Sequence, residues 1–227
     1  MNSFLKLAAV AVLGLAALPS TSNAAPVQVD LACIGVSGPT ELSANVVCPL
    51  YDASLYGGFS LAGMQIEITG QMQGSITLQN NALTTQNVNA TTFSEFYATP
   101  QHGGFSLSSP VFTVSFGTGL QSLAAGASVP FTGLDSGPQS TGFLSATGPI
   151  GAYAGVGTFN LGISTLTGIS VVGGGGQIGN SQVTMGMAGA NVRYFYDDGS
   201  VSTPEPASMA LLGAGLLGFG MMRRRRK

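Results

Sequence analysis

Residues 64–79 alternate between apolar and polar side chains without interruption. The even positions hold six large apolar residues and two glycines, and every odd position holds Gln, Glu, Ser or Thr. Successive side chains of a β-strand point to opposite faces, so the pattern predicts a strand with one buried and one solvated face. A straight strand of this length would span ~50 Å at ~3.3 Å per residue. We therefore expect a bend or tight turn at Gly70 or Gly74.

Shorter alternating segments recur along the chain, and turn-forming Gly and Pro residues separate them. The alternating segments are residues 27–33, 112–116, 159–163 and 192–196, and the turn-rich ones are residues 100–104, 137–138, 148–149 and 173–176. Many short strands with such turns predict an all-β fold, an antiparallel β-sandwich of jelly-roll-like type. Helices are expected only at the two ends of the chain.

Residues 1–24 have the layout of a secretory signal peptide, with Lys6 ahead of an apolar run over residues 7–18. Twelve apolar residues are too few to span a membrane, which takes ~20. Small residues precede the expected cleavage point between Ala24 and Ala25. The pattern predicts export by the Sec machinery and removal of a signal helix by signal peptidase.

The C-terminal residues 204–227 combine proline punctuation, an apolar span and a basic stop. They are Pro204, Glu205 and Pro206, then the uncharged residues 207–222, then Arg223, Arg224, Arg225, Arg226 and Lys227. Clustered cations stay on the cytoplasmic side, which places the body on the side to which the signal peptide sends it. At 1.5 Å per residue the span is only ~24 Å long, which favours a single transmembrane helix that anchors the chain transiently in the inner membrane.

This C-terminal segment resembles the PEP-CTERM sorting signal, which has a Pro-Glu-Pro tripeptide, a Gly- and Leu-rich helix and a basic end. Thr203 stands where that family often has Val. The resemblance implies that the partner is exosortase, a membrane-embedded transpeptidase-like enzyme of bacteria that usually also make exopolysaccharide. It further implies that the destination is the cell surface or the extracellular matrix.

The body between the two ends, residues 25–203, is expected to form one domain. It contains eight acidic residues and one base, Arg193, for a formal net charge of −7. A body with a single cation cannot neutralise a phosphate backbone, so nucleic acid is excluded as a partner, and anionic membrane surfaces are disfavoured. Residues 64–200 also resemble, more diffusely, the choice-of-anchor domains of exported bacterial proteins, partly through a turn at residues 131–134 and the glycines at residues 173–176.

Cys33 and Cys48 are the only cysteines of the chain, and both lie in the exported body. An oxidising compartment and an even number of cysteines predict one disulfide, which closes a small loop. The alternative is a reactive thiol, but the sequence offers no nearby His or Lys to activate one.

Several other segments could carry chemistry, and each has a simpler interpretation. His102 is the only histidine and lies among turn residues; residues 197–199 fit a hairpin turn better than a Ca²⁺ loop. The glycine pattern at residues 213–218 lies inside the membrane segment, and residues 173–176 lack the Lys of a phosphate loop, so that a flexible hairpin connection is expected there. We expect no catalytic residues, metal or cofactor.

The sequence thus favours a non-enzymatic protein of the cell surface or matrix, structural or adhesive, associated with exopolysaccharide in a biofilm. The alternative is a secreted polysaccharide-binding or polysaccharide-modifying enzyme, because two carboxylates can converge from distant positions. Aromatic stacking on sugars would depend on tyrosines outside the clearest strands, since the chain has no Trp. These tyrosines are Tyr51, Tyr56, Tyr97 and Tyr153.

Overall fold

A computed structural model describes residues 26–199, and within this range it consists of strands and short 3-10 helices without any α-helix. Residues Pro26–Asp198 cluster as one compact unit, which lies inside the predicted body. The strands are β1 (Val27–Ala32), β2 (Val36–Pro39), β3 (Ser43–Pro49), β4 (Leu61–Asn80), β5 (Gln86–Pro100), β6 (Phe112–Leu123), β7 (Ser128–Asp135), β8 (Gln139–Ser140), β9 (Leu144–Ser145), β10 (Thr158–Gly173) and β11 (Ile178–Tyr196). The 3-10 helices are η1 (Ala53–Tyr56), η2 (Gly151–Tyr153) and η3 (Gly174–Gly176). The predicted signal and membrane helices lie outside the described residues.

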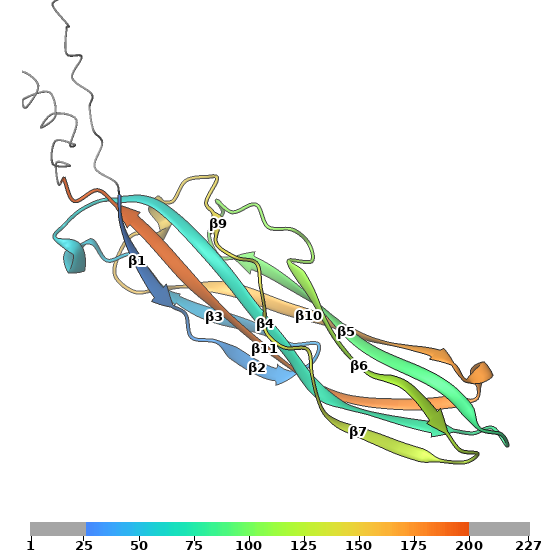
Figure 1. The fold of residues 1–227 in the computed structure, drawn as a ribbon. Coiled ribbons are helices and arrows are strands. Elements are labelled where there is room, and N and C mark those ends of the chain that lie inside the picture. Colours follow the sequence, from blue (N-terminus) through green and yellow to red (C-terminus); the bar gives the residue numbers. More distant parts are fainter. Residues whose placement is uncertain (1–25, 200–227) are drawn as a thin grey trace, which may run out of the picture. The chain divides into compact units, whose positions relative to one another are not determined.

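Two antiparallel sheets form the unit (Figure 1). Sheet A has the order β1-β11-β4-β7, with β2 beside β11 and with β8 and β9 beside β4. Sheet B has the order β3-β10-β5-β6. The inward side chains of both sheets supply the buried core, which confirms the predicted antiparallel sandwich.

The strand order is that of a jelly roll. Within the described range, β1 and β2 run on one side of β11, and β7, β8 and β9 run in succession along one side of β4, so each set acts as one row. The domain then has eight rows in chain order: β1 with β2, β3, β4, β5, β6, β7 with β8 and β9, β10, and β11. The first row pairs with the eighth (β1 with β11), the second with the seventh (β3 with β10), the third with the sixth (β4 with β7) and the fourth with the fifth (β5 with β6). A long antiparallel hairpin rolled into two sheets has this pairing, as the jelly-roll-like expectation requires.

Strand β4 confirms the predicted alternation and contains no turn at Gly70 or Gly74. The apolar side chains at its even positions are buried, and it runs unbroken through Gly70 and Gly74 for 20 residues. A bend or turn was predicted because a straight strand of ~50 Å is long for a small domain. Strand β11 supports this length, since it pairs with β4 from Ile178 opposite Asn80 to Tyr194 opposite Met64.

Gly70 gives space to aromatic rings of sheet B. A Cβ at this position would lie 2.8 Å from two ring carbons of Phe112 and 2.9 Å from Cε1 of Phe96. These two rings stack with centroids 5.0 Å apart and pack in the core beneath β4. The glycine therefore allows the sheets to approach closely where a turn was expected.

Hydroxyl groups bridge the two sheets where the interior is not apolar. Thr92 on β5 is fully buried, and its Oγ1 donates to Oε1 of Gln182 on β11 at 2.8 Å. Thr165 on β10 of sheet B accepts from the backbone N–H of Leu42, which lies in the connection between β2 and β3, at 2.9 Å. Because a buried hydroxyl without a partner costs free energy, these pairs keep the polar interior compatible with folding.

The glycine run at residues 173–176 is a crossover between the sheets, and the predicted hairpin connection is wrong. Strand β10 belongs to sheet B and β11 to sheet A, with η3 between them. Gly173, Gly174, Gly175 and Gly176 all have positive φ angles, and a Cβ on Gly173 would lie 2.3 Å from the carbonyl oxygen of Asn87. The predicted turn at residues 131–134 is also wrong, because these residues lie within β7 where its register with β4 shifts.

Candidate functional site

The predicted sorting and processing residues lie outside the described part of the chain. They are the signal cleavage residues Ala24 and Ala25, the tripeptide Pro204, Glu205 and Pro206, and the basic residues Arg223, Arg224, Arg225, Arg226 and Lys227. Among the residues described, no helix is long and apolar enough to cross a membrane. The candidate sites of the body are therefore built from residues 26–199.

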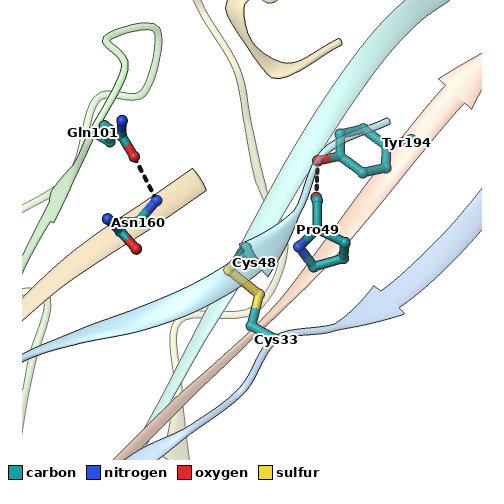
Figure 2. Close-up of a disulfide and its surroundings, with 6 residues drawn as sticks. All are labelled: Cys33, Cys48, Pro49, Gln101, Asn160 and Tyr194. Carbon is teal, nitrogen blue, oxygen red and sulfur yellow. Dashed lines mark hydrogen bonds between the residues drawn. A yellow bond between two sulfur atoms is a disulfide. The ribbon is translucent and has the colours of Figure 1, made fainter. Parts of the chain in front are cut away.

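Cys33 and Cys48 form the predicted disulfide, which joins the two sheets (Figure 2). Cys33 directly follows β1 of sheet A, and the fully buried Cys48 lies in β3 of sheet B. Next to the disulfide, the hydroxyl of Tyr194 donates to the carbonyl of Pro49 at 2.7 Å, and burial raises the pKa of Tyr194. The bond therefore links the edges of the two sheets at a rigid, packed position.

Removal of this disulfide by Cys33→Ala with Cys48→Ala should lower the free energy of unfolding by about 3 kcal/mol. The two cysteines are 15 residues apart in sequence, and the loop that they close restricts the unfolded chain. Denaturant titration of both proteins, oxidised and reduced, measures the effect. Reduction of the wild type should reproduce most of the loss, and reduction of the double variant should change nothing. An unchanged midpoint in the variant would contradict a stabilising role.

His102 lies in the turn after β5, as predicted, and its ring meets Tyr153 edge to face at 5.4 Å between centroids. The Tyr153 hydroxyl donates to the carbonyl oxygens of His102 and Gly103. A neighbouring contact fixes the same loop, because the backbone N–H of Asn160 donates to Oε1 of Gln101 at 2.7 Å (Figure 2). Tyr153 therefore holds the loop in place.

The tyrosines considered for sugar stacking are mostly committed to the fold. Tyr51 and Tyr153 are fully buried, and Tyr56 stacks on Tyr51 with centroids 5.2 Å apart. Tyr97 lies on the outer face of sheet B and donates its hydroxyl to Glu95 at 2.6 Å, which raises the Tyr97 pKa. The buried pair offers no ring face to a ligand.

The acidic residues of sheet A are held on its outer face by hydrogen bonds. Asp30 pairs with Arg193 through two bonds of 2.8 Å, and Glu67 accepts from Ser140 at 2.5 Å and from Asn191 at 3.0 Å. These donors lower the pKa of both carboxyl groups. The acids therefore stay ionised near neutral pH. Within residues 26–199 no three His, Cys, Asp or Glu residues gather as a metal site would require.

Asp135 orients two glutamines of β4. Its carboxylate accepts from Nε2 of Gln71 at 2.7 and 2.8 Å, from Nε2 of Gln73 at 3.0 Å and from the backbone N–H of Gly137 at 2.8 Å. The Gln71 amide contributes most to lowering the pKa of Asp135. Because both amide nitrogens point to the carboxylate, the Oε1 atoms of the two glutamines are left as hydrogen-bond acceptors.

An open groove of about 370 Å³ runs across the outer face of sheet A beside these glutamines. Its residues come from three neighbouring strands, β4, β7 and β11. They are Gln73, Gly74, Ser75, Gly133, Leu134, Asp135, Val183 and Met185. A smaller hollow of about 130 Å³ lies next to it along β4 and β11, with Gln71 and Met187 among its lining residues. We call these two hollows together the sheet A groove.

Sequence reasoning missed this groove. Its apolar side comes from Val183, Met185 and Met187, which face outward at alternate positions of β11, and its polar side comes from β4. The alternation of apolar residues at 183, 185 and 187 was a usable signal. The pairing of Met185 with Gln73 could not be predicted, because the register of two strands that are distant in sequence does not follow from the sequence of either strand alone.

Comparison with known proteins identifies the C-terminal segment. The family model described as "PEP-CTERM protein-sorting motif" matches residues 202–226. A search of curated proteins found no match.

Solved structures give only a weak likeness. A chain of infectious bursal disease virus, Gt strain, is 9% identical with a TM-score of 0.18, and the match covers 87% of this chain and 48% of the viral one. The present chain thus spans about half of that protein. A chain of mud crab tombus-like virus is also 9% identical with a TM-score of 0.18, covering 93% of this chain and 99% of the viral one. No functional conclusion follows from such scores.

The matched segment includes the Pro-Glu-Pro tripeptide, the apolar residues 207–222 that follow it and most of the basic cluster. It indicates that the protein is exported and sorted by exosortase from a membrane-anchored precursor for display at the cell surface. The chain therefore carries a PEP-CTERM protein-sorting motif at residues 202–226.

Proposed function

We propose that the protein is a non-enzymatic component of the cell surface or extracellular matrix, where it binds exopolysaccharide in a structural or adhesive role. Its body would lie on the periplasmic side of the inner membrane until exosortase releases it. The observation that carries the proposal is the sheet A groove, an exposed concave surface on a rigid sheet in a protein sorted to the surface. Amide, hydroxyl and apolar groups side by side suit the hydroxyl edges and C–H faces of sugar rings.

Two of the acids on the outer face of sheet A lack the environment that the general acid of a glycosidase needs. Glu67 and Asp135 each accept hydrogen bonds from neighbouring side chains, and their pKa values are lowered. A general acid in a glycosidase needs a raised pKa, so that it carries a proton near neutral pH. The pKa values of Glu67 and Asp135 are lowered instead, so neither carboxyl group holds such a proton near neutral pH.

Binding of the processed protein to exopolysaccharides purified from the producing bacterium tests the proposal. We expect saturable binding to at least one of them and no release of reducing ends. A lack of binding to all of them would refute the adhesive role. Release of reducing ends that disappears in Glu67→Gln would establish the alternative, a polysaccharide-modifying enzyme.

A further inference from the structure

The outer face of sheet A carries an apolar column, formed by Val183, Met185 and Met187 of β11, whose side chains point away from the core. The outward positions of an antiparallel sheet with one solvated face are normally polar, and those of β4 follow this rule. On β11, however, Val183 is 71% exposed and Met185 is 50% exposed. Both side chains face solvent beside the polar groups of the sheet A groove. Neighbouring apolar residues exposed inside a groove mark a ligand surface more often than a chance position.

The register of β4 and β11 sets this column against a column of hydrogen-bonding side chains. Val183 lies opposite Ser75, Met185 opposite Gln73, and Met187 opposite Gln71. Directly opposed side chains are ~5 Å apart, so each rung presents an apolar group and a polar group to the same ligand. A sugar ring has the same division, with an apolar C–H face and a polar rim.

The polar column is rich in acceptors. Asp135 takes both N–H bonds of the Gln71 amide and one of the Gln73 amide, so the groups left for a ligand are the two amide oxygens and one N–H of Gln73. Asp135 itself accepts three side-chain bonds and the N–H of Gly137, which nearly fills its lone pairs. Asp135 therefore acts as a positioning residue, and acceptors outnumber donors among the glutamine groups that a ligand meets, so a ligand that donates hydrogen bonds is favoured.

The net negative charge of the body further restricts the class of ligand that the groove can bind. The body carries a formal net charge of −7, and its one base, Arg193, is paired with Asp30 and stacked over the ring of Phe143. None of the residues that line the groove is basic. An acidic polysaccharide would therefore meet repulsion without a compensating cation.

We infer that the sheet A groove binds a glycan without acidic groups, whose hydroxyl or amine groups donate to Gln71 and Gln73 and whose sugar ring packs on Met185. The inference rests on the proposed function and specifies its site and ligand class. Neutral sugars and amino sugars share the donor groups that this site requires.

Three glycan probes test the ligand class on the processed protein: a neutral glucan oligosaccharide, a chitosan oligosaccharide and an alginate oligosaccharide. We expect measurable binding of the glucan or the chitosan, and binding of alginate at least tenfold weaker than that of the better one. Because the ammonium groups of chitosan are attracted to the acidic body as a whole, the two are compared at high ionic strength, where the stronger binder tells whether hydroxyl or amine donors prevail. Alginate binding as tight as that of the better probe would overturn the inference.

Two variants and two matched controls test the site. Asp135→Asn and Met185→Ala should each weaken binding about fivefold to tenfold, from lost orientation of the glutamines and lost apolar contact. Glu95→Gln removes the same charge from the outer face of sheet B, and Leu166→Ala truncates an apolar side chain that is 55% exposed on that sheet. Both controls should bind within twofold of the wild type.

The outcomes separate this inference from the proposed function. Equal weakening by Asp135→Asn and Glu95→Gln would assign the effect to net charge and reject the groove. Unchanged binding in both groove variants would also reject it, while binding of the wild type to matrix polysaccharide would keep the proposed function. A wild type that binds neither the glucan nor the chitosan would overturn this inference.

Discussion

Replacement of Pro204, Glu205 and Pro206 by alanine should leave the precursor in the inner membrane with its C-terminal segment still attached. A proline on each side of a residue favours an extended backbone, which a transpeptidase-like active site should accept more readily than a helix. Alanine would let the following helix extend through the site. The effect on release should be nearly complete, because recognition of the tripeptide precedes every later step.

Intact-mass measurement of the cell-surface form checks this prediction. The wild-type product should begin at Ala25 and end close to Thr203. Deletion of residues 223–227 serves as a comparison, since loss of these charges should disturb retention and topology without changing the tripeptide. A wild-type surface product that retains residues 207–227 in an exosortase-positive host would disprove the processing mechanism.

Gly74→Ala should be the most destabilising single substitution that we propose in the body. A Cβ at Gly74 would lie 2.3 Å from the carbonyl oxygen of Val183 and 3.1 Å from the Cα of Thr184. These are backbone atoms of β11, so rotation of a side chain cannot relieve the overlap. Because β4 is paired with β11 on one side and with β7 on the other, the strands would have to separate. We expect a loss of about 3 kcal/mol or more in the free energy of unfolding.

Gly186→Ala is the matched control. Gly186 also lies inside sheet A with its inward position in the core, but a Cβ there would meet only Cγ2 of Thr165, at 4.0 Å. This variant should be neutral or slightly stabilising, because alanine restricts the unfolded chain more than glycine does. Thermal unfolding should separate the two variants by roughly 6–12 °C for a domain of this size. Similar melting temperatures would show that the close approach at Gly74 is not restrictive.

The sandwich could be predicted from the sequence because the alternation of apolar and polar residues within each strand identifies a buried face and a solvated face. The even positions of β4, from Met64 to Leu78, read as one buried stripe in any partner arrangement. The disulfide could be predicted for a similar reason, since Cys33 and Cys48 had no other cysteine to pair with. Both conclusions depend only on local pattern or on counting.

Features that depend on two distant segments could not be read in this way. A bend or tight turn was expected at Gly70 or Gly74, and the role of Gly70 became visible only when Phe96 and Phe112 were found beneath it. The crossover at residues 173–176 looks like a hairpin until β10 and β11 are assigned to different sheets. The sheet A groove likewise requires the register between Gln73 and Met185. In each case the decisive contact spans many residues of sequence.

The central position of β11 determines how the domain responds to mechanical load. The described chain ends just after this strand, so tension applied through the C-terminus enters along β11. This strand is bonded to β4 along nearly its whole length, and β1 and β2 border parts of its other side. Hydrogen bonds between antiparallel strands lie perpendicular to the strand direction, so a pull along β11 shears many of them at once. Tension along β11 that is resisted by the rest of the sheet is therefore shared among the hydrogen bonds of two neighbouring ladders.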